Sequence, residues 1–336
     1  MTAGPKDFIR RLPKAELHLH LEGTISPETL VELSRRHDTE PLNLDQAQAL
    51  YQYTDFHGFL MAFKSVTERL RTAEDYELIT YKMLEQLAAQ GVVHAEAYVA
   101  VGLVYYWERG DFEPIFAAME RAREKAEKDF GITLYWIFDA VRHFGVEAAT
   151  RVFRKAAEMK SEYPSIVGIG IGGDERNGPA ELFRDAYSEA RDAGLRLTVH
   201  AGEAVGPESI WGALNIGAER LGHVLTAIHD HELVHLLAER QVPLEICVTS
   251  NLRTGCCAKL EDHPVRRYFD EGLMVTLNSD DPTMFGGDLE GEYLLAHNAF
   301  GFTEEQLREL ASNSIEASFL PPEQKVRWLR QIDETV

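Results

Sequence analysis

Short apolar runs rich in β-branched residues alternate with amphipathic stretches along the whole chain. This alternation is typical of a parallel sheet wrapped by helices. Eight runs are predicted strands, namely residues 15–21, 92–100, 133–141, 166–173, 195–203, 220–224, 242–250 and 273–279. Eight strand and helix units in about 250 residues or slightly more is the size of a (β/α)8 TIM barrel. We therefore expect an α/β fold of this type.

Capping residues mark the predicted helix boundaries. Ser26 precedes Pro27 at a first-turn position, and Thr72 is followed three residues later by Asp75. Glycines predicted to end a helix before its strand are Gly91, Gly131, Gly194 and Gly272. Residues 45–90 form a long helical insertion after the first strand, placed to cover the top of the barrel. No linker rich in Pro, Gly or Ser divides residues 1–336, so we expect one domain.

A doubly wound open sheet is the alternative architecture. It usually carries a Gly-rich phosphate turn after its first strand, where this chain has His-Leu-His. The run of glycines at residues 168–173 has the wrong spacing for a dinucleotide loop and lies within a predicted strand. Small residues that leave room inside a barrel are the better interpretation.

His18 and His20 lie two residues apart near the end of the first predicted strand. Because strand side chains alternate between faces, both imidazoles point to one side. An H-x-H pair alone is more often incidental than metal-binding. Further ionisable residues lie at the ends of other predicted strands: His200 and Glu203 close the fifth, His223 closes the sixth, and Asp280 and Asp281 follow the eighth. Barrel enzymes place their active sites at this C-terminal face, so we predict that these residues gather there.

Each of these residues taken alone has a structural alternative, such as a hydrogen-bonded histidine or an aspartate that caps a helix. Burying all of them together without a metal or a substrate would be costly, so the joint pattern favours a site. Three imidazoles and a carboxylate suit a divalent ion of the zinc type, which lowers the pKa of a bound water to about 7. Glu203, His223 and Asp281 are then candidate acids and bases.

Composition excludes several classes of partner. The chain has 34 basic and 55 acidic side chains and a formal net charge of −21, so we expect no nucleic-acid binding. The longest apolar run, residues 98–107, is shorter than the roughly 20 residues of a membrane span. Residues 1–14 are charged and lack the apolar core of a secretion signal, so we expect a cytoplasmic location. The three cysteines form neither a disulfide framework nor a C-x-x-C zinc pair.

Over nearly its whole length the chain resembles the adenosine deaminase family of the amidohydrolase superfamily. The matching segments, in the family's order, are Ala15-Glu-Leu-His-Leu-His-Leu-Glu-Gly23, Gly172-Gly-Asp-Glu175, His200-Ala-Gly-Glu203, Arg220-Leu-Gly-His223, Thr249-Ser-Asn251 and Asn278-Ser-Asp-Asp-Pro282. The resemblance implies hydrolytic removal of ammonia from carbon 6 of an adenine-type purine, with one Zn²⁺ per chain.

Residue roles follow from the same resemblance. The implied metal ligands are His18, His20, His200 and Asp280. Glu203 would carry a proton to purine N1, while His223 and Asp281 would orient and deprotonate the attacking water. The implied substrate contacts are His20, Glu22, Gly173, Asp281, Phe59 and Phe63. The two phenylalanines lie in an apolar lid at residues 56–63, for which the core face of an amphipathic helix is the alternative.

The substrate is narrowed by departures from the family pattern. Glu22 stands where adenosine-specific relatives usually carry Asp, which favours the branch of adenine and aminodeoxyfutalosine deaminases. Residues 251–255 favour the latter or generalist bacterial enzymes. We expect an adenosine-like nucleoside, either adenosine or 6-amino-6-deoxyfutalosine; the alternatives are free adenine, or a purine-binding barrel without catalysis. Arg142, His143 and Arg253 either reach a substrate carboxylate or pair with surface acids.

Residues 231–235 spell H-E-x-x-H, the motif of zinc metalloproteases. Such a protease needs a third ligand downstream, but the chain has neither a Gly-x-x-His continuation nor a Glu at position 255, which is Gly. We therefore predict that this segment begins a solvated outer helix after the sixth strand.

Overall fold

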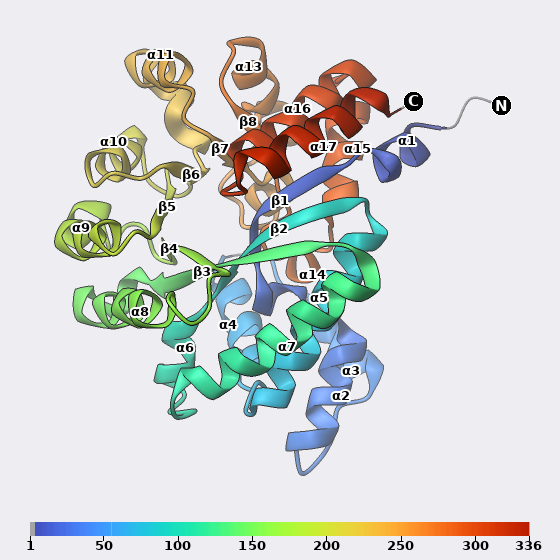
Figure 1. Ribbon diagram of the computed structural model, residues 1–336, viewed down its shortest axis with the longest axis vertical. Helices are drawn as coiled ribbons and strands as arrows, with labels where there is room; N and C mark the ends of the chain where they lie inside the picture. Colours follow the sequence, from blue (N-terminus) through green and yellow to red (C-terminus); the bar gives the residue numbers. More distant parts are fainter. Residues whose placement is uncertain (1–3, 55, 336) are drawn as a thin grey trace.

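Eight parallel strands follow one another in chain order around a nearly closed barrel in the computed structural model, which describes residues 4–54 and 56–335 (Figure 1). The strands are β1 (Lys14–His20), β2 (Val92–Val99), β3 (Thr133–Val141), β4 (Ile166–Gly172), β5 (Arg196–Ala201), β6 (Arg220–His223), β7 (Leu244–Ile246) and β8 (Val275–Leu277). The predicted (β/α)8 architecture is confirmed.

The seam between the last and the first strand lies beyond the regular part of β8. Leu19 and Asp280 form a parallel bridge there. The Asp280 amide donates to the His18 carbonyl at 3.0 Å, and the His20 amide donates to the Asp280 carbonyl at 2.8 Å. The backbone of a candidate metal ligand therefore joins the two ends of the sheet.

Helices surround the strands (Figure 1). They are α1 (Pro5–Arg11), α2 (Pro27–His37), α3 (Leu44–Ala49), α4 (Phe56–Thr67), α5 (Ala73–Ala89), α6 (Val101–Tyr106), α7 (Phe112–Phe130), α8 (Val146–Met159), α9 (Arg184–Asp192), α10 (Pro207–Asn215), α11 (His231–Arg240), α12 (Val248–Arg253), α13 (Val265–Asp270), α14 (Pro282–Phe285), α15 (Leu289–Phe300), α16 (Glu304–Ala317) and α17 (Pro322–Glu334). The insertion after β1 comprises α2 to α5 and begins earlier than predicted, at Pro27.

The predicted caps are present. The Ser26 hydroxyl accepts a hydrogen bond from the Thr29 amide at 3.2 Å, and Asp75 Oδ2 accepts from the Thr72 amide at 2.9 Å. All four predicted helix-ending glycines have positive φ angles, namely Gly91 (81°), Gly131 (74°), Gly194 (78°) and Gly272 (78°). A residue with a Cβ is strained in this region, so glycine fits these positions.

One predicted strand is wrong in its second half. Residues 242–250 were expected to be extended, but β7 ends at Ile246 and α12 begins at Val248. The Glu292 carboxylate accepts hydrogen bonds from the amides of Val248 and Thr249 at 3.0 and 3.1 Å. This carboxylate caps the first turn of α12, and a tertiary contact thereby overrides the strand preference of Val and Thr.

The glycine run of β4 makes room inside the barrel, as predicted. A Cβ on Gly170 would lie 2.7 Å from the Tyr98 ring, closer than non-bonded atoms approach. The glycines therefore serve packing of the barrel interior.

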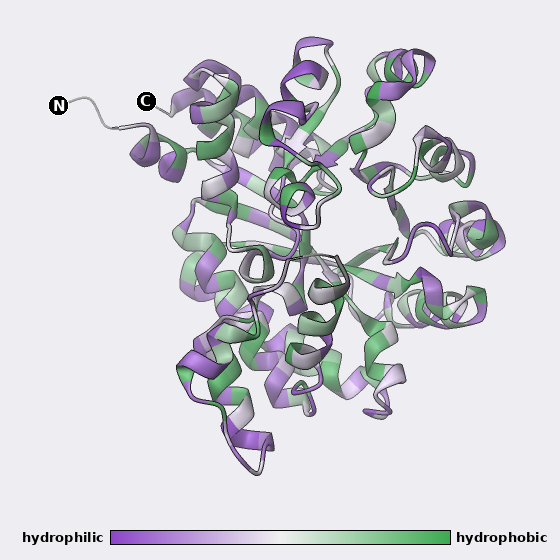
Figure 2. Ribbon diagram, turned by 180° about the vertical axis from the view of Figure 1, so that it is seen from behind, coloured by the Kyte–Doolittle hydropathy of each residue, from purple (hydrophilic) through white to green (hydrophobic). Residues whose placement is uncertain are grey.

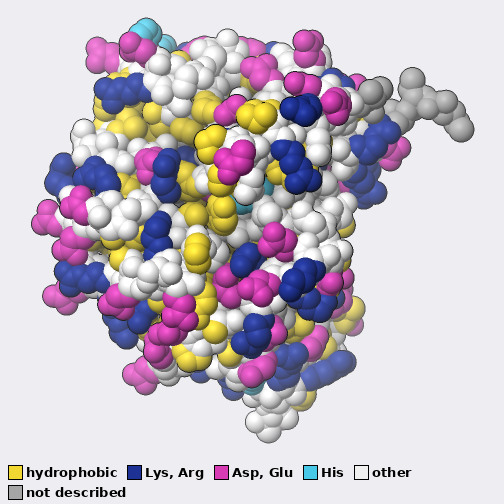
Figure 3. All heavy atoms as spheres, in the orientation of Figure 1, with side chains coloured by type: hydrophobic (Ala, Val, Ile, Leu, Met, Phe, Trp, Pro, Cys, Tyr) yellow, Lys and Arg dark blue, Asp and Glu magenta, His cyan; other side chains and the backbone are white. Residues whose placement is uncertain are grey.

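The outer surface carries the many charged side chains of the sequence. In Figure 2 the outer helices carry hydrophilic and hydrophobic colours side by side, as amphipathic helices do. Acidic and basic side chains are interspersed over the face shown in Figure 3. In the described chain no helix is long and apolar enough to span a membrane.

Candidate active site

Four side chains from three strand ends converge on one point. His18 and His20 come from β1, His200 from β5, and Asp280 from the seam after β8, and their ligand atoms lie within 4.8 Å of one another. His20 Nε2 is 3.1 Å from His200 Nε2, while Asp280 Oδ1 is 3.4 Å from His18 Nε2 and 3.3 Å from His20 Nε2. Zinc bonds of about 2.0–2.1 Å at tetrahedral angles place ligand atoms roughly 3.3 Å apart. The predicted ligand set therefore has the dimensions of a zinc site.

The electrostatics of this cluster favour a cation. His18 Nε2 is buried and has no hydrogen-bond partner among the described residues. Burial lowers the pKa of His18, but Asp280 and Glu245 outweigh it and raise the pKa to about 9. Because these carboxylates stabilise positive charge at the imidazole, a divalent cation fits the same position.

The backbone of Asp280 is fixed in an uncommon conformation. Its φ angle is 63°, in the left-handed region that few residues other than glycine adopt. Its Oδ2 accepts a hydrogen bond from the Ser250 hydroxyl at 2.6 Å, which leaves Oδ1 directed toward the histidines. Strained backbone of this kind is concentrated at functional sites.

A buried polar chain behind His18 was missed from the sequence. Glu245 Oε2 lies 2.7 Å from His18 Nδ1 and accepts a hydrogen bond from the Tyr98 hydroxyl at 3.0 Å. Arg220 Nε lies 2.7 Å from Glu245 Oε1, and Arg220 also pairs with Glu96. A carboxylate on the second ring nitrogen fixes the tautomer and the orientation of a ligating histidine. The signal in the sequence was a charged residue inside an otherwise apolar strand.

Glu203, His223 and Asp281, the predicted acids and bases, all line one cavity beside the cluster. Burial raises the pKa of Glu203 to about 8, and the nearby charges of Asp280 and Glu175 add to the effect. Glu203 Oε2 is 3.7 Å from His223 Nε2. Burial also raises the pKa of Asp281 to about 8. A Glu203 carboxyl that is protonated near neutral pH suits proton donation, whereas a divalent cation bound at the neighbouring cluster would favour the ionised, proton-accepting form of Asp281.

Two neighbouring residues, Gly23 and Glu175, fix the positions of Asp281 and Glu203. A Cβ on Gly23 would lie 2.1 Å from Asp281 Oδ1, so only glycine leaves room for this carboxylate. The Glu175 carboxylate accepts hydrogen bonds from the amides of Glu203 and Ala204 at 3.1 and 2.8 Å. Glu175 belongs to the Gly-Gly-Asp-Glu motif, but nothing in its spacing along the chain indicated that it would hold the backbone after Gly202.

Some of the predicted substrate-contact residues line the cavity, and Glu22 does not. Gly173, Phe59 and Phe63 line the cavity, and Phe59 is also part of the buried core. Glu22 is buried and is not among the lining residues of the described chain. Its Oε1 accepts a hydrogen bond from the Ala100 amide at 3.1 Å. Asp139 on β3, which sequence reasoning missed, lines the cavity and is 4% exposed.

Arg142, His143 and Arg253, for which the sequence left two roles open, lie in different environments. Arg142 is buried and donates to backbone carbonyls, including that of His200 at 2.6 Å, so it meets neither of its two predicted alternatives. His143 lines the cavity, and its Nδ1 accepts from the Asp174 amide at 3.3 Å. Arg253 is exposed on α12, with its guanidinium carbon 5.6 Å from the centre of the Tyr53 ring.

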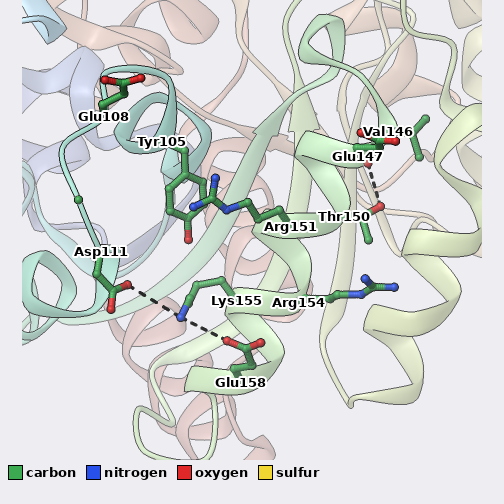
Figure 4. A pocket seen from close by; sticks show the side chains of 11 residues that line it. Tyr105, Glu108, Asp111, Val146, Glu147, Thr150, Arg151, Arg154, Lys155 and Glu158 are labelled. Carbon is green, nitrogen blue, oxygen red and sulfur yellow. Dashed lines mark hydrogen bonds and ion pairs between the residues drawn. The ribbon is translucent and has the colours of Figure 1, made fainter.

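A larger cavity of about 1010 Å³ lies away from these residues, between α8 and the segment that joins α6 to α7 (Figure 4). Its basic side chains are each engaged by a neighbouring group. Lys155 lies 3.2 Å from Glu158 and 4.0 Å from Asp111, and Arg154 pairs with Glu189 at 3.0 Å. The Arg151 guanidinium stacks on Tyr105 at 3.7 Å. The cationic side chains of this cavity therefore all have a partner, and among its described lining residues the acids Glu108 and Glu147 form no ion pair.

The H-E-x-x-H segment begins α11 on the outside of the barrel, as predicted. His231 and His235 are exposed. We expect the double substitution of His231 and His235 by alanine to leave bound zinc unchanged, because neither residue belongs to the four-ligand cluster. Metal analysis of the purified variant checks this expectation, and loss of zinc would contradict it.

Comparison with known proteins agrees with this geometry. Residues 13–335 match the adenosine deaminase family. An aminodeoxyfutalosine deaminase from Streptomyces avermitilis is 40% identical over 97% of this chain and 92% of its own length. The crystal structure of an adenine deaminase from Arthrobacter aurescens superposes with a TM-score of 0.90 at 32% identity, covering 96% of this chain and 98% of that one. An amidohydrolase from Burkholderia ambifaria with bound Zn gives a TM-score of 0.89 at 28% identity, covering 100% of this chain and 94% of that one.

Proposed function

The chain belongs to the adenosine deaminase family and is a purine deaminase with a His-His-His-Asp metal site, and from this premise we propose that its substrate is an adenine nucleoside with an aromatic, anionic extension. Aminodeoxyfutalosine, whose sugar side carries a benzoate group, is the compound of this class that we favour. The cofactor in this proposal is one Zn²⁺ per chain, held by His18, His20, His200 and Asp280.

The observation that carries the proposal is the mouth of the catalytic cavity. From the metal cluster the cavity of about 280 Å³ extends between α4 and α6, past Phe63, Tyr106, Trp107 and Phe144. The rings of Tyr106 and Phe144 stack at 5.3 Å, and Tyr106 is 55% exposed. Free adenine would leave this aromatic mouth unused, whereas a nucleoside with an aromatic extension would pack against it.

Lys64 supplies a positive charge at the same mouth. It is an exposed residue of α4 that lines the cavity, and its Nζ lies 5.7 Å from the centre of the Trp107 ring. Among residues 4–54 and 56–335 it forms no ion pair. In a chain with net charge −21, an uncompensated cation beside the cavity favours an anionic ligand.

The chemistry assigns each catalytic residue one task. Bound zinc would supply an activated water at neutral pH. Glu203 donates a proton to purine N1, which makes carbon 6 more electrophilic, and Asp281 takes the proton of the attacking water. His223 orients that water, and the Gly173 backbone contacts the purine. After the C–O bond forms, the protonated Asp281 returns its proton to the amino group, the C–N bond breaks with release of ammonia, and the hydroxyl proton on the new oxygen passes to Glu203. Glu22 lies behind the cavity wall, and we infer that it acts on the sugar side through Ala100, a lining residue whose amide donates to Glu22 Oε1 at 3.1 Å.

An ultraviolet assay of the purified enzyme tests the substrate class, because loss of the amino group changes purine absorption. We expect the highest kcat/KM with aminodeoxyfutalosine, lower values with adenosine and deoxyadenosine, and the lowest with adenine. Lys64→Met is expected to raise KM for aminodeoxyfutalosine about three- to fivefold, equivalent to one lost exposed ion pair of up to about 1 kcal/mol, with little change for adenosine. The matched control is Lys128→Met on the exposed end of α7.

Two outcomes contradict the proposal. A preference for free adenine over every nucleoside would make the enzyme an adenine deaminase. Equal effects of Lys64→Met on charged and uncharged nucleosides would remove the anionic group from the proposed substrate class.

A further inference from the structure

A chain of hydrogen bonds leads from the outer helix α13 to the catalytic His223. The Val265 amide donates to His263 Nδ1 at 3.2 Å, and His263 Nε2 lies 3.2 Å from Asn251 Oδ1. Asn251 Nδ2 lies 3.1 Å from His223 Nδ1. His263, Asn251 and His223 are at most 4% exposed, so water does not compete for these contacts.

The Val265 amide, at the outer end of this series of hydrogen bonds, determines which atom donates and which accepts in each of them. Val265 is the first residue of α13, and its amide N–H can only donate. His263 Nδ1 must therefore be the acceptor, and a neutral His263 carries its proton on Nε2. Burial lowers the pKa of His263 to about 4, which keeps the ring neutral at physiological pH.

The tautomer of His263 determines the orientation of the Asn251 amide, which in turn determines the tautomer of His223. Because His263 Nε2–H donates, the atom of Asn251 that faces it must be the amide oxygen, and the amide nitrogen must face His223. Asn251 Nδ2–H donates to His223 Nδ1, so the proton of a neutral His223 lies on Nε2. Nε2 is the nitrogen nearer to Glu203, with Oε2 at 3.7 Å, and His223 lines the catalytic cavity.

We propose that His263 is a positioning residue for deamination, because through Asn251 it holds His223 as the Nε2–H tautomer. In this form His223 donates a hydrogen bond to the oxygen that attacks carbon 6 and cannot accept its proton. Proton removal therefore falls to Asp281. The proposal rests on the deamination described above and adds a residue that does not line the catalytic cavity.

Spectroscopy tests the tautomer without any substrate. In zinc-loaded protein labelled with ¹⁵N-histidine, the two ring nitrogens of a neutral imidazole give distinct signals for the protonated and the bare nitrogen. Comparison with His223→Asn assigns the resonance. We expect His223 to show a protonated Nε2 and a bare Nδ1. The reverse pattern would overturn the proposal, even if the chain acts on a different purine from the one proposed.

Two variants of His263 test the effect on turnover with whichever 6-aminopurine proves active. His263→Gln retains an N–H donor at the position of Nε2, whereas His263→Met has similar length and no donor. We expect His263→Met to lower kcat about 10- to 100-fold with KM changed less than about threefold, and His263→Gln to recover most of the loss. Zinc content should be unchanged in both.

The comparison between these variants separates positioning from structure. Equal kcat values for His263→Gln and His263→Met would overturn the proposal, because a donor would then make no difference. If neither variant folds, the tautomer measured in the unsubstituted protein still decides the question.

Discussion

Substitution of Glu203 by glutamine is expected to lower kcat by between about a hundred- and ten-thousand-fold while the chain keeps its zinc. Glutamine has nearly the same shape as glutamate but cannot transfer a proton. Glu203 lies outside the four-ligand cluster, and the Glu175 carboxylate holds its backbone amide at 3.1 Å in a contact that the substitution leaves intact. The loss should therefore appear in turnover and not in metal content.

Steady-state kinetics and metal analysis on the same preparation measure both quantities. Glu208→Gln is the matched control, because Glu208 is an exposed glutamate five residues further along the chain, in the first turn of α10. We expect the control to change kcat by less than about twofold. Zinc loss in Glu203→Gln would make Glu203 a ligand, and an unchanged kcat would exclude it as the proton donor.

Substitution of the adjacent residues Asp280 and Asp281 is expected to have the second large effect, on zinc content and on kcat respectively. We expect Asp280→Ala to lose most of its bound zinc and its activity together, since Asp280 Oδ1 lies within 3.4 Å of two ligand imidazoles. Asp281→Ala should keep its zinc and lose about a hundred- to ten-thousand-fold in kcat, because it removes a proton acceptor and no ligand. The two variants differ by one position and remove the same group, so each is a control for the other.

Metal analysis, kcat and circular dichroism are compared for the pair. The assignment fails if Asp281→Ala loses zinc as well, or if Asp280→Ala retains it. Circular dichroism establishes that the Asp280 variant is folded, which matters because this residue also bridges β1 and β8.

The fold was predictable from the sequence because strand and helix periodicities are local properties. Seven of the predicted strands coincide with observed ones apart from a few end residues. The exception, residues 248–250, depends on a carboxylate more than forty residues away, Glu292, which caps α12. A contact at that separation leaves no trace in local periodicity.

The metal ligands were predictable for a different reason. Each stands at the C-terminal end of a strand or at the seam, so topology brings them together with Glu203, His223 and Asp281, while the choice of the four ligands among these residues came from the family resemblance. The groups that orient them, such as Glu245 and the pair Asn251 and His263, required three-dimensional information. Their partners lie on other strands and helices, and nothing in the spacing along the chain connects them.

The bridge between Leu19 and Asp280 has a consequence for biosynthesis. Two ligands are made near the start of the chain and the fourth more than 250 residues later. At a ribosomal rate of about 5–20 residues per second, the first histidines wait roughly 10–50 seconds for their carboxylate partner. The four-ligand metal site can therefore form only late in translation, after Asp280 has been synthesised.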